Sequence, residues 1–275
     1  MIKTLKMMPV SARIGCFMVL VVIFSGLFAP WLAPYGETRI VGDVWAPFNG
    51  DFLLGTDHLG RDLLSRLLYA TRNTVSIALL ISIISFFLGM TTGFSAAALG
   101  GWFDQIFSRI VDILMAIPIL IFALMILSLV GTSIPVLIVV VSVLDSTRVF
   151  RIARAVAMDI EVIEFVEAAR LRGEGLWWII RHEILPNALP PLVAEFGLRF
   201  CFVVLFISSL SFLGLGIQPP TADWGGMVRE NAGAITFGIF VPLWPAGAIS
   251  FLTVGVNLIV DWFLHGQSKV GIKEN

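Results

Sequence analysis

Residues 73–103 read NTVSIALLISIISFFLGMTTGFSAAALGGWF, a stretch without a single Asp, Glu, Lys or Arg. A helix rises about 1.5 Å per residue, so this stretch is longer than the roughly 30 Å of hydrocarbon in a bilayer. The whole chain agrees with this reading, because 58% of its residues are hydrophobic and only 13% are charged. Soluble domains carry about 25% charged residues. The sequence therefore predicts an all-α integral membrane protein.

Other charge-free runs predict further spans, and they cover residues 14–36, 113–144, 200–222 and 231–260. The run 113–144 is too long for one span and contains the helix-breaking sequence Gly131-Thr132-Ser133-Ile134-Pro135, so we divide it there. Six transmembrane helices are expected, at 13–34, 74–99, 107–130, 135–157, 188–214 and 240–263. We group these into an N-terminal anchor helix with an outer segment over 1–73 and a five-span core over 74–275.

Basic residues predict the orientation, because short cytoplasmic loops are enriched in Lys and Arg. If both termini lie in the cytoplasm, twelve of the 18 Lys and Arg residues fall on the inner side. These are Lys3, Lys6, Arg13, Arg109, Arg148, Arg151, Arg154, Arg170, Arg172, Arg181, Lys269 and Lys273. The first span follows basic residues as a signal peptide does, but its long apolar region ends among prolines, so we expect an uncleaved anchor.

A polar segment, residues 159–186, separates the fourth and fifth expected spans. Its charged residues interleave with apolar ones, which predicts a short amphipathic helix. Gly173-Glu174-Gly175 would end this helix, a second helix would follow through Trp177 and Trp178, and Pro186 would stop that helix before the next span. On these residues alone, a hairpin in the lipid headgroups explains the segment as well as a docking site for a partner does.

The segment also contains a spaced motif: Glu167-Ala168-Ala169, three residues, Gly173, twelve residues, then Leu185-Pro186 at its end. This motif resembles the signature of the permease subunits of bacterial ABC importers. Gly55-Thr56-Asp57-His58-Leu59-Gly60-Arg61-Asp62-Leu63-Leu64-Ser65-Arg66-Leu67-Leu68-Tyr69 is similar to the segment after the first span in their dipeptide, oligopeptide and nickel group. One position departs from the family pattern, because Glu183 stands where an Ile usually precedes the proline by three residues.

The resemblance implies the role of such a subunit. Residues 159–186 would form a cytoplasmic loop that meets an ATPase and couples ATP hydrolysis to transport. The coupling residues would be Glu167, Ala168, Ala169, Gly173, Leu185 and Pro186. A second, usually similar but distinct permease subunit, two ATPases and a periplasmic binding protein are the implied partners, in the bacterial inner membrane. Permeases of this group carry peptides, opines, nickel chelates and related small solutes.

Cofactor, metal and nucleic-acid sites are not indicated. The sequence contains no Gly-Lys-Ser/Thr, and its lysines all lie near the two ends, so no phosphate-binding loop is expected. ATP and Mg²⁺ would therefore bind to the partner ATPase and not to this chain. The same distribution leaves no internal lysine cluster for nucleic-acid phosphates. The histidines, at positions 58, 182 and 265, lie in separate segments without metal-ligand spacing.

Two charge patterns leave alternatives open. Glu195 and Arg199 stand at i and i+4 within the fifth expected span and should pair. They either line a polar pathway or form a structural pair that faces the neighbouring subunit. Asp57, Arg61 and Asp62 precede the second span at helical spacings, which suggests a short charged helix on the outer surface. Simple solvation and contact with a binding protein explain that helix equally.

An ion-driven secondary transporter is the alternative function. Such a transporter would be expected to carry several carboxylates near the middle of the membrane. The predicted spans place only Glu195 well inside the membrane, since Asp145 is expected toward the inner end of the fourth span. The charge distribution therefore disfavours an ion-driven transporter, and the importer remains what the resemblance implies.

Overall fold

The computed structural model describes residues 8–271, which form helices joined by loops and contain no named strand. The all-α class is confirmed. The elements are α2 (Val10–Leu27), α3 (Ala29–Leu32), α4 (Leu63–Leu99), α5 (Gly101–Ala116), α6 (Ile119–Val130), α7 (Ile134–Glu161), α8 (Glu164–Leu171), α9 (Leu176–Ile179), the π-helical turn η1 (Ile180–Ile184), α10 (Leu185–Phe212), α11 (Trp224–Asn231), the 3₁₀ turn η2 (Ala232–Phe237) and α12 (Leu243–Gly271). Outside the described residues lie Lys3, Lys6 and Lys273, and with them the side chains of Arg170 and Lys269.

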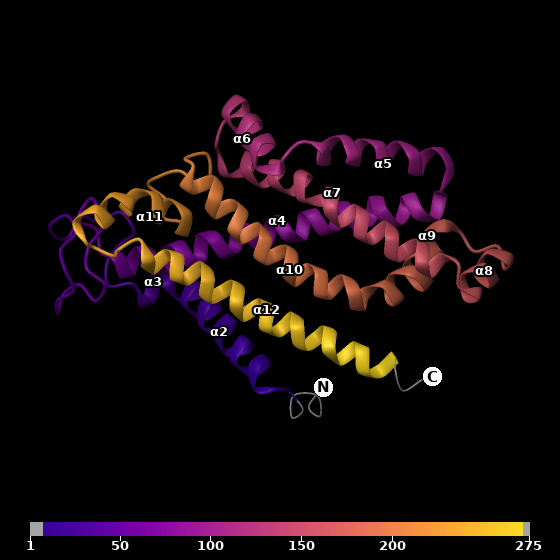
Figure 1. The fold of residues 1–275 in the computed structure, drawn as a ribbon, viewed down its shortest axis with the longest axis horizontal. Coiled ribbons are helices and arrows are strands. Elements are labelled where there is room, and N and C mark those ends of the chain that lie inside the picture. The colour runs from indigo at the N-terminus through magenta and orange to yellow at the C-terminus, as the bar shows by residue number, and fades with distance from the viewer. Residues whose placement is uncertain (1–7, 272–275) are drawn as a thin grey trace.

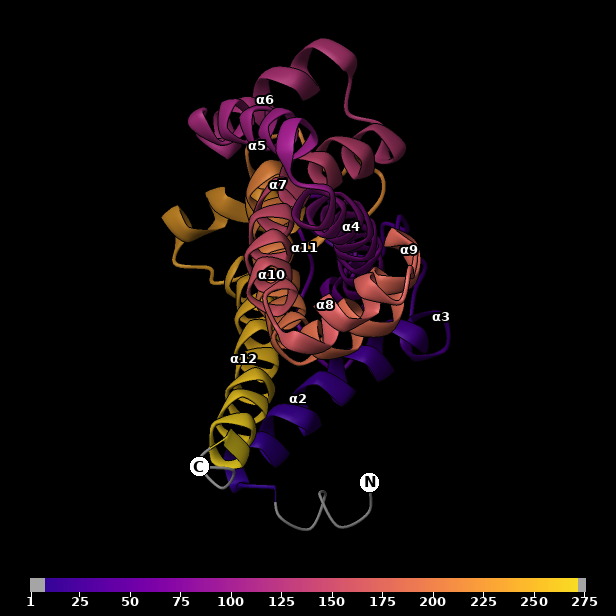
Figure 2. The same ribbon diagram turned by 90° about the vertical axis from the view of Figure 1, so that its right-hand side faces the viewer.

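Three helices, α4, α7 and α10, form the middle of the bundle. Helices α5 and α6 lie on one side of them, and α2 and α12 lie on the other (Figures 1 and 2). Buried side chains from the three central helices, such as Ile81, Leu144 and Ile207, belong to one apolar cluster. Helices α4 and α7 approach closely, because a Cβ added to Gly89 would come 2.5 Å from the Cβ of Val149. Any larger residue at Gly89 would force these two helices apart.

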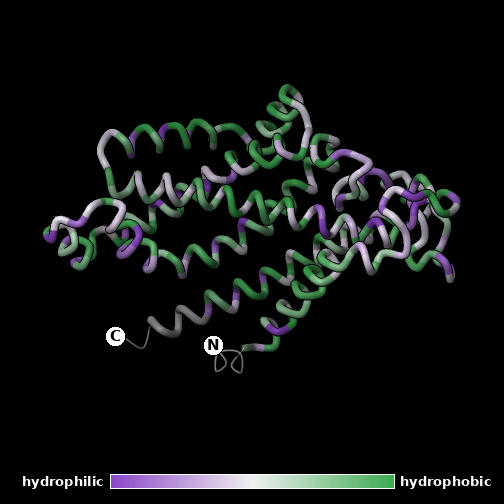
Figure 3. The backbone as a smooth tube through the Cα atoms, turned by 180° about the vertical axis from the view of Figure 1, so that it is seen from behind, coloured by the Kyte–Doolittle hydropathy of each residue, from purple (hydrophilic) through white to green (hydrophobic). Residues whose placement is uncertain are grey.

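Polar residues gather at the two ends of the long axis, whereas the middle is mostly hydrophobic (Figure 3). One end, called the α11 end below, contains α3, α11 and the loop of residues 36–62. The other end, called the α8 end, contains α8 and α9 (Figure 1). The outer segment before α4 thus lies together with the region of α11, and both lie far from the polar segment 159–186.

Within residues 8–271, four helical stretches are long and apolar enough to cross a membrane. They are Val10–Leu27, Leu63–Leu99, Leu176–Phe212 and Leu243–His265, and the bent pair α5 and α6 raises the number to five if it counts as one span. Helix α7 has 28 residues but is not among these stretches, because Asp145, Arg148 and Arg151 interrupt its apolar part. The count of six spans stays a prediction.

The expected single helix over 107–130 is wrong. Helices α5 and α6 meet at an angle of 88°, and the break falls at Ile117-Pro118. Ile117 is extended, with φ −91° and ψ 132°, because a following proline disfavours the helical conformation. The charge-free run crosses this break without any change in composition, so hydropathy did not reveal it.

The boundaries of other helices also differ from the expected ones, most of all at the end of α2 and the start of α4. Helix α2 ends at Leu27, and the short α3 follows it. Helix α4 begins at Leu63, well before residue 74, because the side chain of Asp62 caps it and accepts a hydrogen bond from the Ser65 N–H at 2.8 Å. Helix α4 therefore runs without a break through the division that we drew between residues 73 and 74.

Candidate functional sites

Helix α8 presents two different faces. Val166 and Ala169 are fully buried and belong to an apolar cluster with residues of α7, α9, η1 and α10. Glu167 and Ala168 are exposed, and Leu171 has 84% of its surface open. The motif alanines therefore differ, because Ala169 holds α8 against its own chain while Ala168 faces away from it.

A glycine turn follows α8, as the sequence predicts. Gly173 has φ +82°, a conformation that favours glycine. The turn is closed by a hydrogen bond of 3.2 Å from the Glu174 N–H to the Ala169 carbonyl oxygen. A Cβ added to Gly173 would meet no atom within 4 Å. Within the described residues, backbone conformation and not crowding requires this glycine.

Pro186 does not stop the helix before α10, contrary to the sequence prediction. Helix α9 passes through the π-helical turn η1 into α10, and Pro186 is the second residue of α10. The turn places the Leu185 N–H on the Ile180 carbonyl oxygen, five residues back. The proline is tolerated in this continuous helix because the π-helical turn changes the local hydrogen-bond pattern just before it. Leu185 is half-buried and Pro186 is exposed.

Glu183, which departs from the family motif, has contacts within the chain. Its carboxylate lies 3.9 Å from Nη2 of Arg172, which is more than half exposed. Its carbonyl oxygen accepts a hydrogen bond of 2.7 Å from the Asn187 side chain. Glu183 thus links the glycine turn to the start of α10.

At the α11 end, residues 55–62 form a folded loop, so the expected short charged helix is wrong. Gly55 and Gly60 both have positive φ, of 80° and 76°, and turn the chain back on itself. The Asp57 carboxylate accepts hydrogen bonds of 2.9 Å from the backbone N–H groups of Leu59 and Arg61. The spacing of four between Asp57 and Arg61 is helical, but a tight loop brings them together equally well.

These charges are buried instead of solvated. Arg61 Nε donates to Asp57 Oδ2 at 2.7 Å, and Arg66 Nη1 donates to the same oxygen at 2.6 Å. Arg66 Nη1 also reaches Glu230 Oε2 of α11 at 2.6 Å, and Arg61 Nη2 reaches that oxygen at 3.2 Å. Asp57 is fully buried, and Arg66 is 1% exposed. We call Asp57, Arg61, Arg66 and Glu230 the outer network.

The electrostatics of the outer network favour the charged form of Asp57. Burial alone would raise the pKa of its carboxyl group, but the two backbone N–H groups and the charges of Arg66 and Arg61 hold the pKa below its usual value. Burial also lowers the pKa of His58. One potential metal-ligand atom from each of Asp57, His58 and Glu230 lies within 4.8 Å of the others. Both carboxylates, however, already accept hydrogen bonds from Arg61 and Arg66.

A second charged group lies inside the bundle. Arg199 Nε is 2.7 Å from Glu195 Oε1, so the expected i, i+4 pair is present. Arg199 Nη1 also lies 3.8 Å from Asp145 Oδ1 of α7. The other oxygen of Asp145 accepts a hydrogen bond of 2.9 Å from Ser85 of α4. Asp145, Glu195, Arg199 and Ser85, called the buried polar cluster below, thus connect α4, α7 and α10.

The expectation that Glu195 is the only acid well inside a span is wrong. Asp145 is fully buried in the middle of α7. Arg148 and Arg199 both lie over the ring of Phe202, at 4.5 and 5.2 Å from its centre. Both arginines are partly exposed. The closely following Arg148 and Arg151 suggested the inner end of the span, although position 145 lies near the middle of the predicted range 135–157.

Sequence reasoning missed Glu230 and the role of Asp145. Glu230 contacts Arg66 across 164 positions, and no spacing rule relates residues so far apart. The buried position of Asp145 depends on two other helices. Only one property of the sequence pointed to the role of Asp145. An acid inside a span needs a partner, and Arg199 is a base inside another span.

Comparisons with known proteins identify the family of the chain. Residues 86–268 match the family model described as "Binding-protein-dependent transport system inner membrane component". The chain is 33% identical to the di/tripeptide transport system permease protein DppC of Pseudomonas aeruginosa, covering 90% of this chain and 84% of that protein. It is 30% identical to the dipeptide transport system permease protein DppC of Haemophilus influenzae, covering 91% and 88%. It is also 30% identical to the glutathione transport system permease protein GsiD of Pectobacterium atrosepticum, covering 92% and 84%.

Proposed function

The chain belongs to the family of binding-protein-dependent transport system inner membrane components, and we propose that the solutes it passes into the cell are peptides or chemically related small molecules. It is a permease subunit of an ABC importer and not an enzyme. The names of its relatives, which carry dipeptides, tripeptides and glutathione, support the solute class. Opines and nickel chelates are the other solutes of this class that we consider.

The single observation that carries the mechanism is the exposed face of α8. Glu167 and Ala168 are exposed there, and Leu171 adjoins them with most of its apolar surface open. A short helix with small and apolar residues on its outer face fits a groove on a partner protein. We propose that the partner is an ATPase, which holds the ATP and Mg²⁺, and that Glu167, Ala168, Gly173 and the turn leading to Leu185 and Pro186 transmit its movement.

The proposed assembly contains a second homologous permease subunit, two ATPases and a periplasmic binding protein. The α8 end and both termini would face the cytoplasm, and the α11 end would face the periplasm, in a bacterial inner membrane. Six spans satisfy this arrangement, with α5 and α6 as one broken span and α7 as the charged one. Residues 1–73 would add an anchor and outer segment to the core.

We propose structural roles for the outer network and for the buried polar cluster. The outer network joins the loop before α4 to α11, so it would hold the periplasmic surface in a shape that a binding protein recognises. The buried polar cluster joins three central helices, and its partly exposed edge, at Glu195 and Arg199, would face the second permease subunit and not lipid. This assignment follows from the cost of exposing charge to hydrocarbon.

A reconstituted complex tests the function. The complex, prepared with its binding protein in proteoliposomes, should take up radiolabelled dipeptide only when ATP is supplied. Ala168→Arg should abolish both uptake and retention of the ATPase during purification, because a large charged side chain would occupy the docking face. Ala232→Arg, at an exposed site on the α11 end, should retain the ATPase.

Either of two results would contradict the proposal. Retention of the ATPase and normal uptake in the Ala168→Arg complex would show that α8 is not the docking helix. Uptake driven by an ion gradient in the absence of ATP would indicate the alternative, an ion-driven secondary transporter.

A further inference from the structure

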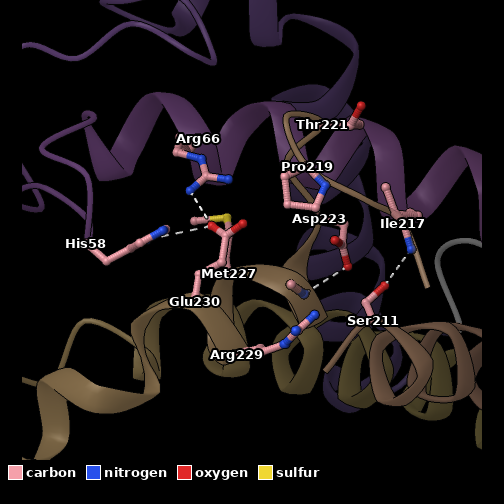
Figure 4. Close-up of a pocket in the computed structure, with 11 residues that line it drawn as sticks. His58, Arg66, Ser211, Ile217, Pro219, Thr221, Asp223, Met227, Arg229 and Glu230 are labelled. Atoms are coloured by element: carbon pink, nitrogen blue, oxygen red, sulfur yellow. Dashed lines mark hydrogen bonds and ion pairs between the residues drawn. The ribbon is translucent and has the colours of Figure 1, made fainter. Parts of the chain in front are cut away.

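A cavity of about 330 Å³ lies beside the outer network at the α11 end. Its size falls at the lower end of the range for small-molecule sites. Side chains from α4, α11 and the segment between α10 and α11 surround it (Figure 4). The charged or titratable residues in its wall are His58, Arg66, Asp223, Arg229 and Glu230. So many charged groups in one small cavity indicate that it can bind a charged ligand.

Arg66 contributes a buried guanidinium with unused hydrogen-bonding capacity. Its Nη1 donates to Asp57 and Glu230, whereas its Nε is buried and has no hydrogen-bond partner. Arg66 is 1% exposed, so water does not compensate for the missing bond. A buried donor without an acceptor costs about 1–3 kcal/mol. A carboxylate in the cavity would provide the acceptor.

Arg229 contributes a second positive charge. Its side chain lies against Gly214, where an added Cβ would come 2.7 Å from Nη1. Arg229 is exposed and forms no ion pair with any acid in the described part of the chain. Its guanidinium is therefore available at the mouth of the cavity, on the side of Ser211 (Figure 4).

Asp223 contributes the opposing charge. It caps α11, and its Oδ2 accepts a hydrogen bond of 3.1 Å from the Gly226 N–H. Burial raises the pKa of this carboxyl group to about 6, although hydrogen bonds from the Gly226 N–H and the Ser211 hydroxyl oppose the rise. No ion pair links Asp223 to a base in the described part of the chain. Asp57 and Glu230 balance Arg61 and Arg66 within the outer network. The cavity is left with one unpaired base, Arg229, and one unpaired acid.

We propose that this cavity binds a small zwitterion, with its carboxylate against Arg66 and Arg229 and its ammonium group against Asp223. A free dipeptide has both groups and a suitable size. The cavity would be an entry site on the permease itself, additional to the site on the binding protein. This inference rests on the peptide transport proposed above.

Direct binding to the assembled complex tests the inference. The complex is placed in nanodiscs without its binding protein, and binding of labelled L-alanyl-L-alanine is measured by equilibrium dialysis. The dipeptide amide, which lacks the carboxylate, should bind about tenfold more weakly, as expected for a lost charge-assisted contact. Arg229→Gln should weaken dipeptide binding by roughly two- to fivefold, in keeping with an exposed charge pair.

Two further variants test which charges bind the dipeptide, the first as a control and the second at Asp223. Arg72→Gln replaces an exposed arginine of α4 that is not in the cavity wall, and it should leave dipeptide binding unchanged. Asp223→Asn preserves a helix-capping side chain but removes the negative charge. It should weaken binding of the dipeptide and leave binding of its N-acetyl derivative, which has no ammonium group, unaltered.

The outcomes also separate this inference from the proposed function. A complex that performs ATP-driven uptake with its binding protein but binds the dipeptide and its amide equally, or binds neither, overturns the cavity inference alone. If Arg229→Gln instead weakens only the docking of the binding protein, the carboxylate belongs to a protein side chain and the inference is wrong. Dipeptide binding in the cavity without any ATP-driven uptake contradicts the proposed function.

Discussion

At the scale of single residues, Gly173 and Gly175 form a natural comparison. Both lie in the turn between α8 and α9, and an added Cβ meets open space at each. Gly173 has φ +82°, whereas Gly175 has an ordinary φ of −73°. An L-residue in the left-handed region costs about 1–2 kcal/mol, and a β-branched one costs more. The two glycines therefore differ in strain and in little else.

We predict that Gly173→Val impairs coupling and that Gly175→Val does not. The strained valine should displace the end of α8, so the purified complex should retain less ATPase and show less ATP-driven uptake. Gly173→Ala should show an intermediate loss. Equal ATPase retention in the two valine variants would mean that the conformation of Gly173 has no part in docking.

The motif alanines show what residue spacing predicts and what it leaves out. The spacing identified the segment and a required glycine, because both depend on local backbone geometry. It did not distinguish Ala168 from Ala169, because that distinction depends on where α7 and η1 lie. A test at Ala169 would confuse docking with folding, since Ala169 is fully buried.

At the scale of the elements, the buried polar cluster holds α7 between α4 and α10. We predict that Asp145→Leu lowers the free energy of unfolding by about 1–3 kcal/mol, the usual cost of leaving a buried polar partner unpaired. Ser85→Ala removes only one hydrogen bond to Asp145 and should cost about 1 kcal/mol. Thermal unfolding of the detergent-solubilised protein measures both.

A second substitution checks the cause of that loss. If pairing with Arg199 is responsible, adding Arg199→Leu to Asp145→Leu should cost less than the sum of the single changes. Strict additivity would show that Asp145 and Arg199 act independently, and that the 3.8 Å separation between them carries no coupling.

Helix existence could be predicted from the sequence, but helix breaks and joins could not. Long charge-free runs require helices in a bilayer, since no other local structure satisfies the backbone there. The chain bends at Pro118, whereas the helix continues through Pro186, so the same residue type has opposite effects at the two positions. Pro118 follows a residue forced into an extended conformation, whereas Pro186 follows a π-helical turn that supplies an alternative hydrogen bond.

At the scale of the whole molecule, the proposed orientation puts the α8 end in the cytoplasm and the α11 end in the periplasm. Ala168 lies on the α8 end and Ala232 on the α11 end, and both are exposed. In a chain lacking Cys16 and Cys201, a membrane-impermeant maleimide should label Ala232→Cys in intact spheroplasts. Ala168→Cys should be labelled only after the membrane is opened. Labelling of Ala168→Cys from outside would reverse the assigned orientation.

The length of α7 has a mechanical consequence. With 28 residues, it is about 42 Å long, and only two residues separate it from α8. Because Ala169 packs α8 into the apolar cluster that includes residues of α7, we expect the two helices to move together. A tilt of only about 3° about one end moves the other end by roughly 2 Å, the size of the helix shifts that switch many proteins. Because the close contact at Gly89 leaves α4 little room to slide past α7, we expect a push on α8 at one membrane surface to move both long helices at the opposite surface.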